Sequence, residues 1–330
     1  MPLLTRMVGA PLAIDIGPGA VASLAPLLAD RRISSGGHVA VAVGPGLGEE
    51  IAAALKPQLE NAEIFTVEGG SVDASRALAA KIREGFYDAL VGIGGGKTLD
   101  VAKHAASLVG LPMVAVATNL AHDGIASPVA SLEEAGHKLS YGVQMPIAVM
   151  VDLDYVRRSD PALRRGGVGD VVSNLSAIAD WRLAERVRGE VVDGVAVTFA
   201  RTAATSIVHR EDGIDDDAFL IALAESLVLS GLAMATAGSS RPCSGGDHEI
   251  LHAIDHLFPG TAHHGELAGA ASLFTSHLRG DDGLARGIDD DSFLIALAEA
   301  LVLSGLAMAT AGSSRPCSGG DHEIDRKSVV

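Results

Sequence analysis

Residues 89–106, ALVGIGGGKTLDVAKHAA, contain the clearest structural pattern in this chain. The first part of this stretch is an apolar run typical of a buried strand, and its last part has a helical pattern. Gly94, Gly95 and Gly96 stand between them, where a glycine backbone can approach a pyrophosphate and the N–H groups of the following helix favour anionic oxygens. Lys97 adds a positive charge. Glycines also simply terminate strands, so the turn alone indicates a nucleotide site only moderately.

The same alternation of strand and helix runs through the first half of the chain. Strands are predicted at residues 12–17, 38–44, 89–96, 112–118 and 148–154. Helices are predicted between them, at residues 20–31, 49–59, 73–85 and 98–110. Such an order predicts a Rossmann-like α/β domain with a parallel sheet, in which ligands bind beyond the carboxyl ends of the strands. We assign residues 1–158 to this nucleotide-binding domain.

From about Asp160 onward the strand patterns stop. Helices are predicted at residues 170–189, 193–209 and 218–238, and in two histidine-rich segments. We therefore predict an all-α domain over residues 159–286 that binds metal and substrate, with a cleft between the two domains. The apolar run 218–238 is long enough to cross a bilayer. Because it carries Glu225 and has no flanking Trp or Tyr, we interpret it as a buried helix.

Composition excludes several classes of partner. The formal net charge of -16 repels a phosphate backbone, and no cluster of Lys or Arg offsets it, so nucleic-acid binding is not expected. The start of the chain lacks the pattern of a secretory signal, and no membrane association is expected. Cys243 and Cys317 occupy equivalent places in a duplicated segment, which argues against a disulfide and favours a reduced cytoplasm.

Three histidines in SGGDHEILHAIDHLFPGTAHHGE, residues 244–266, suggest a metal site. His248 and His252 are four residues apart and share one helix face, while His264 comes from the next segment. Histidines on a half-apolar helix are more often hydrogen-bonded core or surface residues. Asp170, in GGVGDVVSN, is predicted at the start of a helix, where an N-cap is the ordinary role. It becomes a candidate ligand if the histidines point the same way.

A second polar segment, VATNLAHDGIASPVAS at residues 116–131, follows a predicted strand. Thr118 and Ser127 can hydrogen-bond a nucleotide, and Asp123 stands where a polar substrate would enter the cleft. An Asx-type turn at residues 122–124 explains the same local chemistry equally well.

A near-copy of residues 213–250 occupies residues 287–324, with differences only at Ala218/Ser292 and Ser226/Ala300. Natural structural repeats diverge and usually number more than two, so this is no solenoid. The final DRKSVV can be back-translated into the start of a common sequencing adapter. We interpret residues 287–330 as an assembly artefact joined to a truncated gene, and amplification of the locus from source DNA tests this.

Taken together, four motifs resemble the sn-glycerol-1-phosphate dehydrogenases. They are GGGKTLDVAK (94–103), HDGIASP (122–128), GVGDVVSN with ADW (167–181), and SSRPCSGGDHEILHAID (239–255) followed by HHGE. This family is a branch of the superfamily that also holds glycerol dehydrogenase, iron-dependent alcohol dehydrogenases and dehydroquinate synthase. The resemblance covers about residues 1–285 and implies the dehydroquinate synthase-like fold.

The resemblance also implies roles for individual residues. Asp170, His248 and His264 would hold a divalent metal, Zn²⁺ or alternatively Ni²⁺ or Fe²⁺. Asp123 and His252 would be catalytic, and these two with Asp170 would contact substrate. The nicotinamide cofactor would lie along Gly94, Gly95, Gly96, Lys97, Thr98, Thr118, Asn119, Leu120, Ala121 and Ser127.

These residue types suit the reduction of a small phosphorylated ketone. A carboxylate and two imidazoles leave a divalent ion an open position, at which it can polarise the C2 carbonyl of dihydroxyacetone phosphate. The cofactor, NAD or NADP, supplies the hydride. After the strand at 38–44 the chain reads PGLG, with no acidic residue for the adenosine ribose, so discrimination against NADP is expected to be weak.

Three alternatives to this function stay open. Within the same scaffold they are glycerol dehydrogenase and dehydroquinate synthase, and from another class an inactive nucleotide-binding homologue. The intact parent is expected to be a homo-oligomer. In the family, further helices cover the helical domain where this chain has the copied segment, so apolar helix faces are expected to be exposed.

Overall fold

The first half of the chain forms a six-stranded parallel sheet, in a computed structural model that describes residues 9–280 except 60 and 259. The strand order is β1-β8-β5-β4-β2-β3. The bounds are β1 Ala13–Gly17, β2 Val39–Val43, β3 Ala62–Thr66, β4 Ala89–Gly94, β5 Met113–Ala117 and β8 Ala148–Asp152. The five predicted strands are confirmed. The edge strand β3 was missed because its side chains are mostly half-buried or exposed, so no apolar run marks it.

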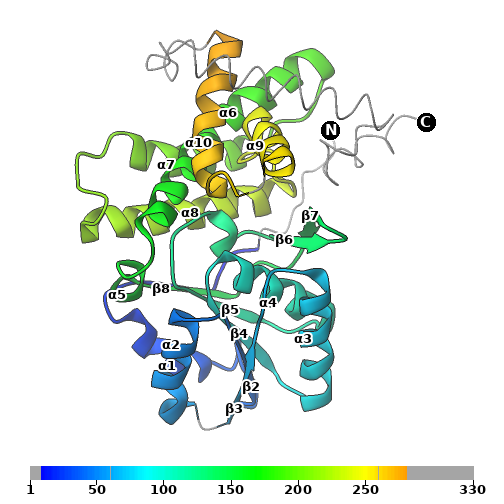
Figure 1. Ribbon diagram of the computed structural model, residues 1–330, viewed down its shortest axis with the longest axis vertical. Helices are drawn as coiled ribbons and strands as arrows, with labels where there is room; N and C mark the ends of the chain where they lie inside the picture. The colour runs from blue at the N-terminus through cyan, green and yellow to red at the C-terminus, as the bar shows by residue number, and fades with distance from the viewer. Residues whose placement is uncertain (1–8, 60, 259, 281–330) are drawn as a thin grey trace.

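Helices cover both faces of the sheet (Figure 1). Alternating side chains of the strands pack against these helices. In β2, Val41 packs in a core with Leu24 and Ile51, whereas the neighbouring Ala40 faces a second core that holds Leu78 and Leu99. These four partners lie on α1 (Leu24–Leu28), α2 (Leu47–Leu55), α3 (Val72–Gly85) and α4 (Gly96–Val109). A parallel sheet buried on both faces is what the continuous apolar runs predict, and the α/β fold class is confirmed.

A β-hairpin that the sequence did not predict extends from the carboxyl side of the sheet. It pairs β6 (Val129–Glu134) with antiparallel β7 (His137–Gly142). The two turn residues, Ala135 and Gly136, have φ angles of 52° and 82°. Positive φ at both positions is the geometry of a tight type I′ hairpin. The motif is easily missed because alanine is not a usual residue for the first of these positions.

The described residues after 160 form helices and no strands. They are α6 (Pro161–Arg188), α7 (Gly194–Val208), α8 (Asp217–Ala237), α9 (Gly246–Leu257) and α10 (His264–Arg279), and they occupy the upper half of Figure 1. The boundary that we propose after residue 158 lies in the turn between the short helix α5 (Leu153–Val156) and α6. The copied segment 287–324, with Cys317, lies outside the described residues.

Helix α6 corrects one prediction. The helix begins at Pro161, and the Asp160 carboxylate caps it by accepting the Ala162 N–H at 2.8 Å. Asp170 therefore lies inside the helix, and its predicted place at a helix start was wrong. Gly166, Gly167 and Gly169 also lie within this helix, although glycine disfavours helix interiors. The reason is close packing, described below.

Helix α8 is long and apolar enough to span a membrane by length and composition, but 67% of its most apolar window is buried within the protein. Leu220, Leu223 and Leu227 are wholly enclosed in the larger core, together with residues of the sheet domain. It serves as a core helix that joins the helical half to the sheet. The interpretation of residues 218–238 as buried helix is confirmed.

Candidate metal and cofactor site

Asp170, His248 and His264 converge from three helices above the carboxyl ends of the strands. Each offers a ligand atom, and these atoms all lie within 4.8 Å of one another. Asp170 Oδ1 is 3.8 Å from His248 Nε2 and 3.7 Å from His264 Nε2. One carboxylate and two imidazoles are a donor set that suits a catalytic divalent ion and leaves a position open for substrate. The residues present therefore fit the metal that the resemblance implies.

Glycines explain how two of these helices come close enough. A Cβ atom at Gly265 of α10 would lie 1.9 Å from the carbonyl oxygen of Gly166 in α6. A Cβ at Gly169 would lie 2.1 Å from the carbonyl oxygen of Gly265. Only glycine permits such backbone contact. The crossing of α6 and α10 sets Asp170, one residue beyond Gly169, beside His264, one residue before Gly265.

His248 is oriented by a carboxylate that the sequence analysis did not single out. Asp247 is fully buried, and its Oδ1 lies 2.9 Å from His248 Nδ1. A neutral His248 that donates Nδ1–H to this carboxylate presents Nε2 to the metal position, the usual arrangement behind a metal-bound histidine. Asp247 directly precedes His248, and this adjacency in the sequence is the signal that could have found it.

Electrostatics at the cluster favour a cation. Burial alone lowers the pKa of His248, but the hydrogen bond to Asp247 and the charges of Asp170 and Asp123 outweigh it and raise the pKa to about 9. Burial, followed by the neighbouring histidines, holds the pKa of His264 well below its ordinary value. Burial also raises the pKa of Asp170. A divalent ion would replace the proton that these acidic groups attract, because metal ligands must be deprotonated.

Replacement of Asp247 by Asn is expected to weaken Zn²⁺ binding by about 10-fold or more, since losses behind a metal-bound histidine typically reach that size. Asparagine keeps the shape but loses the charge that orients His248. Competition with a chromogenic chelator measures the affinity. Unchanged affinity would remove Asp247 from the account of the site.

Asp123 belongs to the loop that links the cluster to the sheet. Its backbone N–H donates to Asp170 Oδ2 at 2.8 Å. Burial, and next the charge of Asp170, raise the pKa of the Asp123 side chain to about 7. Part of the predicted turn is also present, because the Gly124 N–H donates to the ring of His122 at 3.0 Å. The turn therefore coexists with a position of Asp123 beside Asp170.

Lys103 holds the loop that carries Asp123 in place, and the sequence analysis did not assign it a role. Its side chain is 0% exposed and pairs with Asp100 at 2.8 Å on the same helix. Its Nζ donates to the carbonyl oxygens of Gly124, at 2.8 Å, and of Val129. Its Nζ also lies 3.4 Å from the Ser127 hydroxyl, and a buried lysine whose donors all serve groups of the protein is structural. It ties α4, the helix after the glycine turn, to the loop that carries Asp123.

The predicted cofactor residues lie together at the start of α4 and the end of β5. Gly94 ends β4, Gly95 precedes α4 and Gly96 begins it, so the strand–glycine–helix prediction is confirmed. A Cβ at Gly96 would lie 2.1 Å from His122 Nε2, and one at Gly95 would lie 2.6 Å from Asn119 Nδ2. The glycines therefore leave room for the loop after β5 to approach the opening of the helix.

The other predicted contacts differ in how they can serve a cofactor. Lys97 is exposed at the first turn of α4, and Asn119 and Ala121 are half-buried. Thr98 and Thr118 are about 5% exposed. Two are engaged within the protein: the Leu120 side chain lies wholly in the core, and the Ser127 hydroxyl donates to the Val129 carbonyl at 3.1 Å. A cofactor would reach Leu120 only through its backbone.

His252 completes the predicted set at the cluster. Its ring centroid lies 6.3 Å from that of His248 and 6.1 Å from that of His264. The His122 ring lies 6.0 Å from that of His264 on the side of the glycine turn. The ring of His122 thus lies near both His264, one of the three predicted metal ligands, and the glycine turn at residues 94–96.

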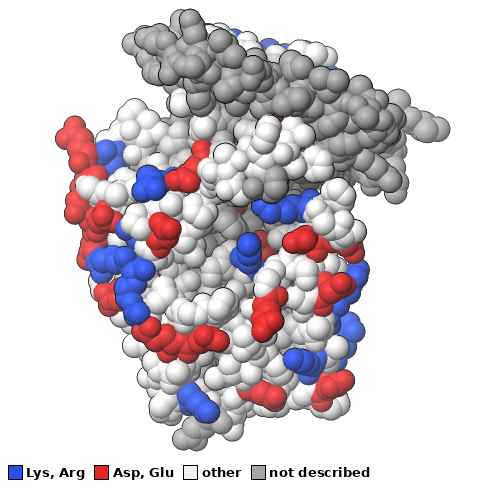
Figure 2. Space-filling model, viewed as in Figure 1, with Lys and Arg blue, Asp and Glu red and all other residues white. Residues whose placement is uncertain are grey.

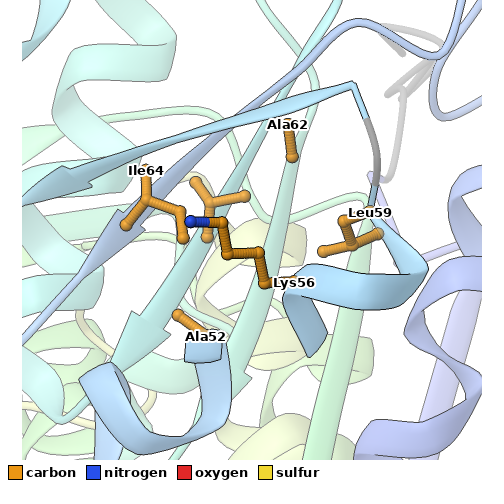
Figure 3. A pocket seen from close by; sticks show the side chains of 6 residues that line it. Ala52, Lys56, Leu59, Ala62 and Ile64 are labelled. Atoms are coloured by element: carbon orange, nitrogen blue, oxygen red, sulfur yellow. The ribbon is translucent and has the colours of Figure 1, made fainter. Parts of the chain in front are cut away.

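The surface of this face is hollowed between the two halves, and Lys and Arg are interspersed with Asp and Glu around it (Figure 2). A separate small recess lies at the far end of the sheet domain, lined by Val41, Ala52, Lys56, Leu59, Ala62 and Ile64 (Figure 3). The Lys56 chain crosses this recess, which is apolar and far from the histidines. It is not part of the site.

Comparison with known proteins first gives the class. Residues 15–159 match the family model described as iron-containing alcohol dehydrogenase. The fold agrees: a glycerol dehydrogenase from Schizosaccharomyces pombe superposes with a TM-score of 0.68 at 19% identity, covering 90% of this chain and 77% of that one. The sheet half of the chain thus matches the iron-containing alcohol dehydrogenases in sequence, and the superposition shows that the fold is shared over most of the chain.

Sequence relatives narrow the class to a family. Glycerol-1-phosphate dehydrogenase [NAD(P)+] of Methanospirillum hungatei JF-1 is 36% identical over 289 residues, which cover 84% of this chain and 78% of that enzyme. The enzyme of the same name from Archaeoglobus fulgidus is 40% identical over 230 residues, covering 68% of this chain and 65% of its own length. The chain belongs to the glycerol-1-phosphate dehydrogenase family. The class and family names indicate a metal and a nucleotide cofactor.

Proposed function

We propose that this chain interconverts dihydroxyacetone phosphate and sn-glycerol 1-phosphate by hydride transfer at C2. The observation that carries the proposal is the convergence of Asp170, His248 and His264 beside the loop that joins them to the glycine turn. A ketone at the open metal position would lie next to the cofactor turn, which is the arrangement that hydride transfer requires. The names of the relatives supply the substrate.

Each residue has a defined part in this proposal. Asp170, His248 and His264 would hold the metal, which supplies Lewis-acid polarisation of the C2 carbonyl when bound. Asp123 and His252 border the cluster and would orient the substrate hydroxyls. Reduction adds a hydride from the nicotinamide to C2 and a proton to its oxygen, and oxidation returns both. We assign the proton transfer to His252 or Asp123, with a bound water as an alternative carrier.

The choice of metal and coenzyme forms the finer part of the proposal. Zn²⁺ is the first choice for one carboxylate and two imidazoles, with Ni²⁺ or Fe²⁺ as alternatives. Both NAD and NADP are proposed as coenzymes. The segment after β2 reads Gly44, Pro45 and Gly46, with no acidic side chain to bind an adenosine ribose.

A steady-state assay tests the function. Metal-loaded protein is expected to reduce dihydroxyacetone phosphate with NADH or NADPH and to yield the sn-1 enantiomer of glycerol phosphate on chiral analysis. Equal oxidation of glycerol and of glycerol 1-phosphate would favour glycerol dehydrogenase instead. Less than one bound divalent ion per two chains, without turnover, would favour the inactive nucleotide-binding homologue.

A cytoplasmic location and assembly into a homo-oligomer are part of the proposal. The buried free thiol of Cys243 is compatible with a reducing compartment. Exposed apolar side chains on the helical half, Val187 at 72% and Val191 at 80%, are compatible with cover by further protein.

A further inference from the structure

Helix α9 carries a row of polar side chains that continues past the metal site. His248, His252 and Asp255 follow one another at spacings of four and three residues, which puts them on one face of the helix. Asp255 lies about 10 Å along the helix axis from His248, at a rise of about 1.5 Å per residue. The row therefore leads from the metal position, past His252, towards the hairpin.

Lys138 of the hairpin meets the end of this row. Its Nζ is 2.8 Å from Asp255 Oδ2, with 54% of the lysine side chain and 17% of the aspartate side chain exposed. The adjacent His137 stacks on His256 of α9, with ring centroids 5.9 Å apart and planes 25° apart. The stack holds β7 against α9, beside the pair of Lys138 and Asp255.

The spacing matches a short phosphorylated ketone. A carbonyl oxygen about 2 Å from the metal, a three-carbon skeleton and phosphate ester on the order of 5 Å long, and a charge-assisted hydrogen bond of about 2.8 Å together span roughly 10 Å. This is similar to the rise of about 10 Å along α9 between the backbone positions of His248 and Asp255. A phosphate dianion needs a cationic partner. Lys138, which pairs with Asp255 at the end of the row, is such a cation.

Other cations near the cluster have different surroundings. The ammonium group of Lys103 is enclosed and serves backbone carbonyls and Asp100. Arg165 pairs with Glu266, and it lies five residues before Asp170, roughly 140° around α6 from the face that carries the ligand. Lys97 stands at the glycine turn, where the cofactor phosphates are expected. Lys138 combines solvent access with a position at the substrate end of the row.

We propose that Lys138 binds the phosphate group of the substrate and leaves Asp255 to do so. This inference rests on the proposed function and names the residue that separates phosphorylated from unphosphorylated substrates. Asp255 then acts as the resting partner of Lys138, and its carboxylate competes with the phosphate. The hairpin, inserted between β5 and β8, thereby becomes the specificity element of the enzyme.

Opposite effects of the two partners of this ion pair test the proposal. For Lys138→Met we expect the KM for dihydroxyacetone phosphate to rise about 10-fold or more, because a charge-assisted hydrogen bond is lost. The ratio of kcat/KM for dihydroxyacetone phosphate to that for dihydroxyacetone falls by a similar factor, and inorganic phosphate becomes a weaker competitive inhibitor. Lys138→Arg retains most of the ratio. For Asp255→Asn the same KM is expected to fall, because the competing carboxylate is gone.

Arg76→Met is the matched control. Arg76 is an exposed cation that pairs with Glu134 of the same hairpin from α3, and its loss is expected to leave the substrate ratio unchanged. If Lys138→Met and Asp255→Asn raise the KM by the same factor, the ion pair only holds the hairpin against α9, and the proposal is wrong. A Lys138→Met ratio equal to that of wild type also overturns it. Failure of the proposed function is separate: the wild-type protein would then turn over neither ketone.

Discussion

Asp170→Asn is expected to lower the affinity for Zn²⁺ by about 10-fold or more and to reduce turnover of dihydroxyacetone phosphate accordingly, while NADH binding persists. The factor is a lower bound, since even losses behind the ligands typically reach it. Asparagine preserves the shape, and its carbonyl oxygen can still accept the Asp123 N–H that now bonds to Asp170 Oδ2. The loop beside the glycine turn therefore keeps its support. Chelator competition and NADH fluorescence titration measure the two affinities.

Asp160→Asn controls for this substitution on the same helix. The Asp160 carboxylate caps α6, and asparagine caps helices about as well, so both affinities should equal those of wild type. If different residues bind the metal and the cofactor, Asp170→Asn must lower the affinity for zinc without lowering the affinity for NADH. Parallel loss of zinc and NADH binding would show instead that Asp170 maintains the fold of the whole site.

Gly265→Ala is expected to destabilise the apo protein by about 1–3 kcal/mol, the usual cost of overpacking a close contact. The new methyl group would lie 1.9 Å from the carbonyl oxygen of Gly166, so α10 must move away from α6. This outweighs the gain of about 1 kcal/mol that alanine brings to a helix interior. The displacement also separates His264 from Asp170, so zinc affinity should fall. Urea denaturation in the presence of a chelator measures the stability change alone.

Gly194→Ala provides the comparison. Gly194 opens α7, and nothing lies within 4 Å of the position that its Cβ would occupy. The free energy of unfolding of the Gly194→Ala protein should equal or slightly exceed that of wild type. A Gly265 variant with a urea midpoint at or above that of wild type would mean that the two helices tolerate a wider separation, and glycine would no longer explain the geometry of the ligands.

Much of the fold was predictable because buried parallel strands are marked by uninterrupted apolar runs such as those of β2 and β5. The hairpin was not, because β6 alternates buried with exposed residues and β7 alternates half-buried with exposed ones, so no continuous apolar run marks either strand around the Ala-Gly turn. Helix α6 was predicted too short for a related reason. Residues Gly166, Gly167 and Gly169 have low intrinsic helix propensity, and their role becomes visible only once α10 and the loop after β5 are packed against them.

Of the site, the ligand residues were accessible to sequence reasoning, whereas most of the groups around them were not, Asp247 being the exception because it directly precedes His248. The spacing of four residues between His248 and His252 predicts that the two histidines share one face of a helix. Lys103 and Lys138 act through contacts with Gly124 and Asp255, which lie 21 and 117 positions away, whereas Asp247 directly precedes the histidine that it orients. Aspartate and lysine also occur as ordinary surface and core residues. The roles of Lys103 and Lys138 in the site therefore become visible only in the tertiary structure.

The central claim is that Asp170, His248 and His264 bind one divalent ion. Anomalous diffraction at the zinc absorption edge, from crystals of the zinc-loaded protein, tests it most directly. We predict one strong peak between the three side chains, about 2.0–2.2 Å from an Asp170 oxygen and from the Nε2 atoms of His248 and His264. A peak elsewhere in the protein, or none at these residues, would contradict the account.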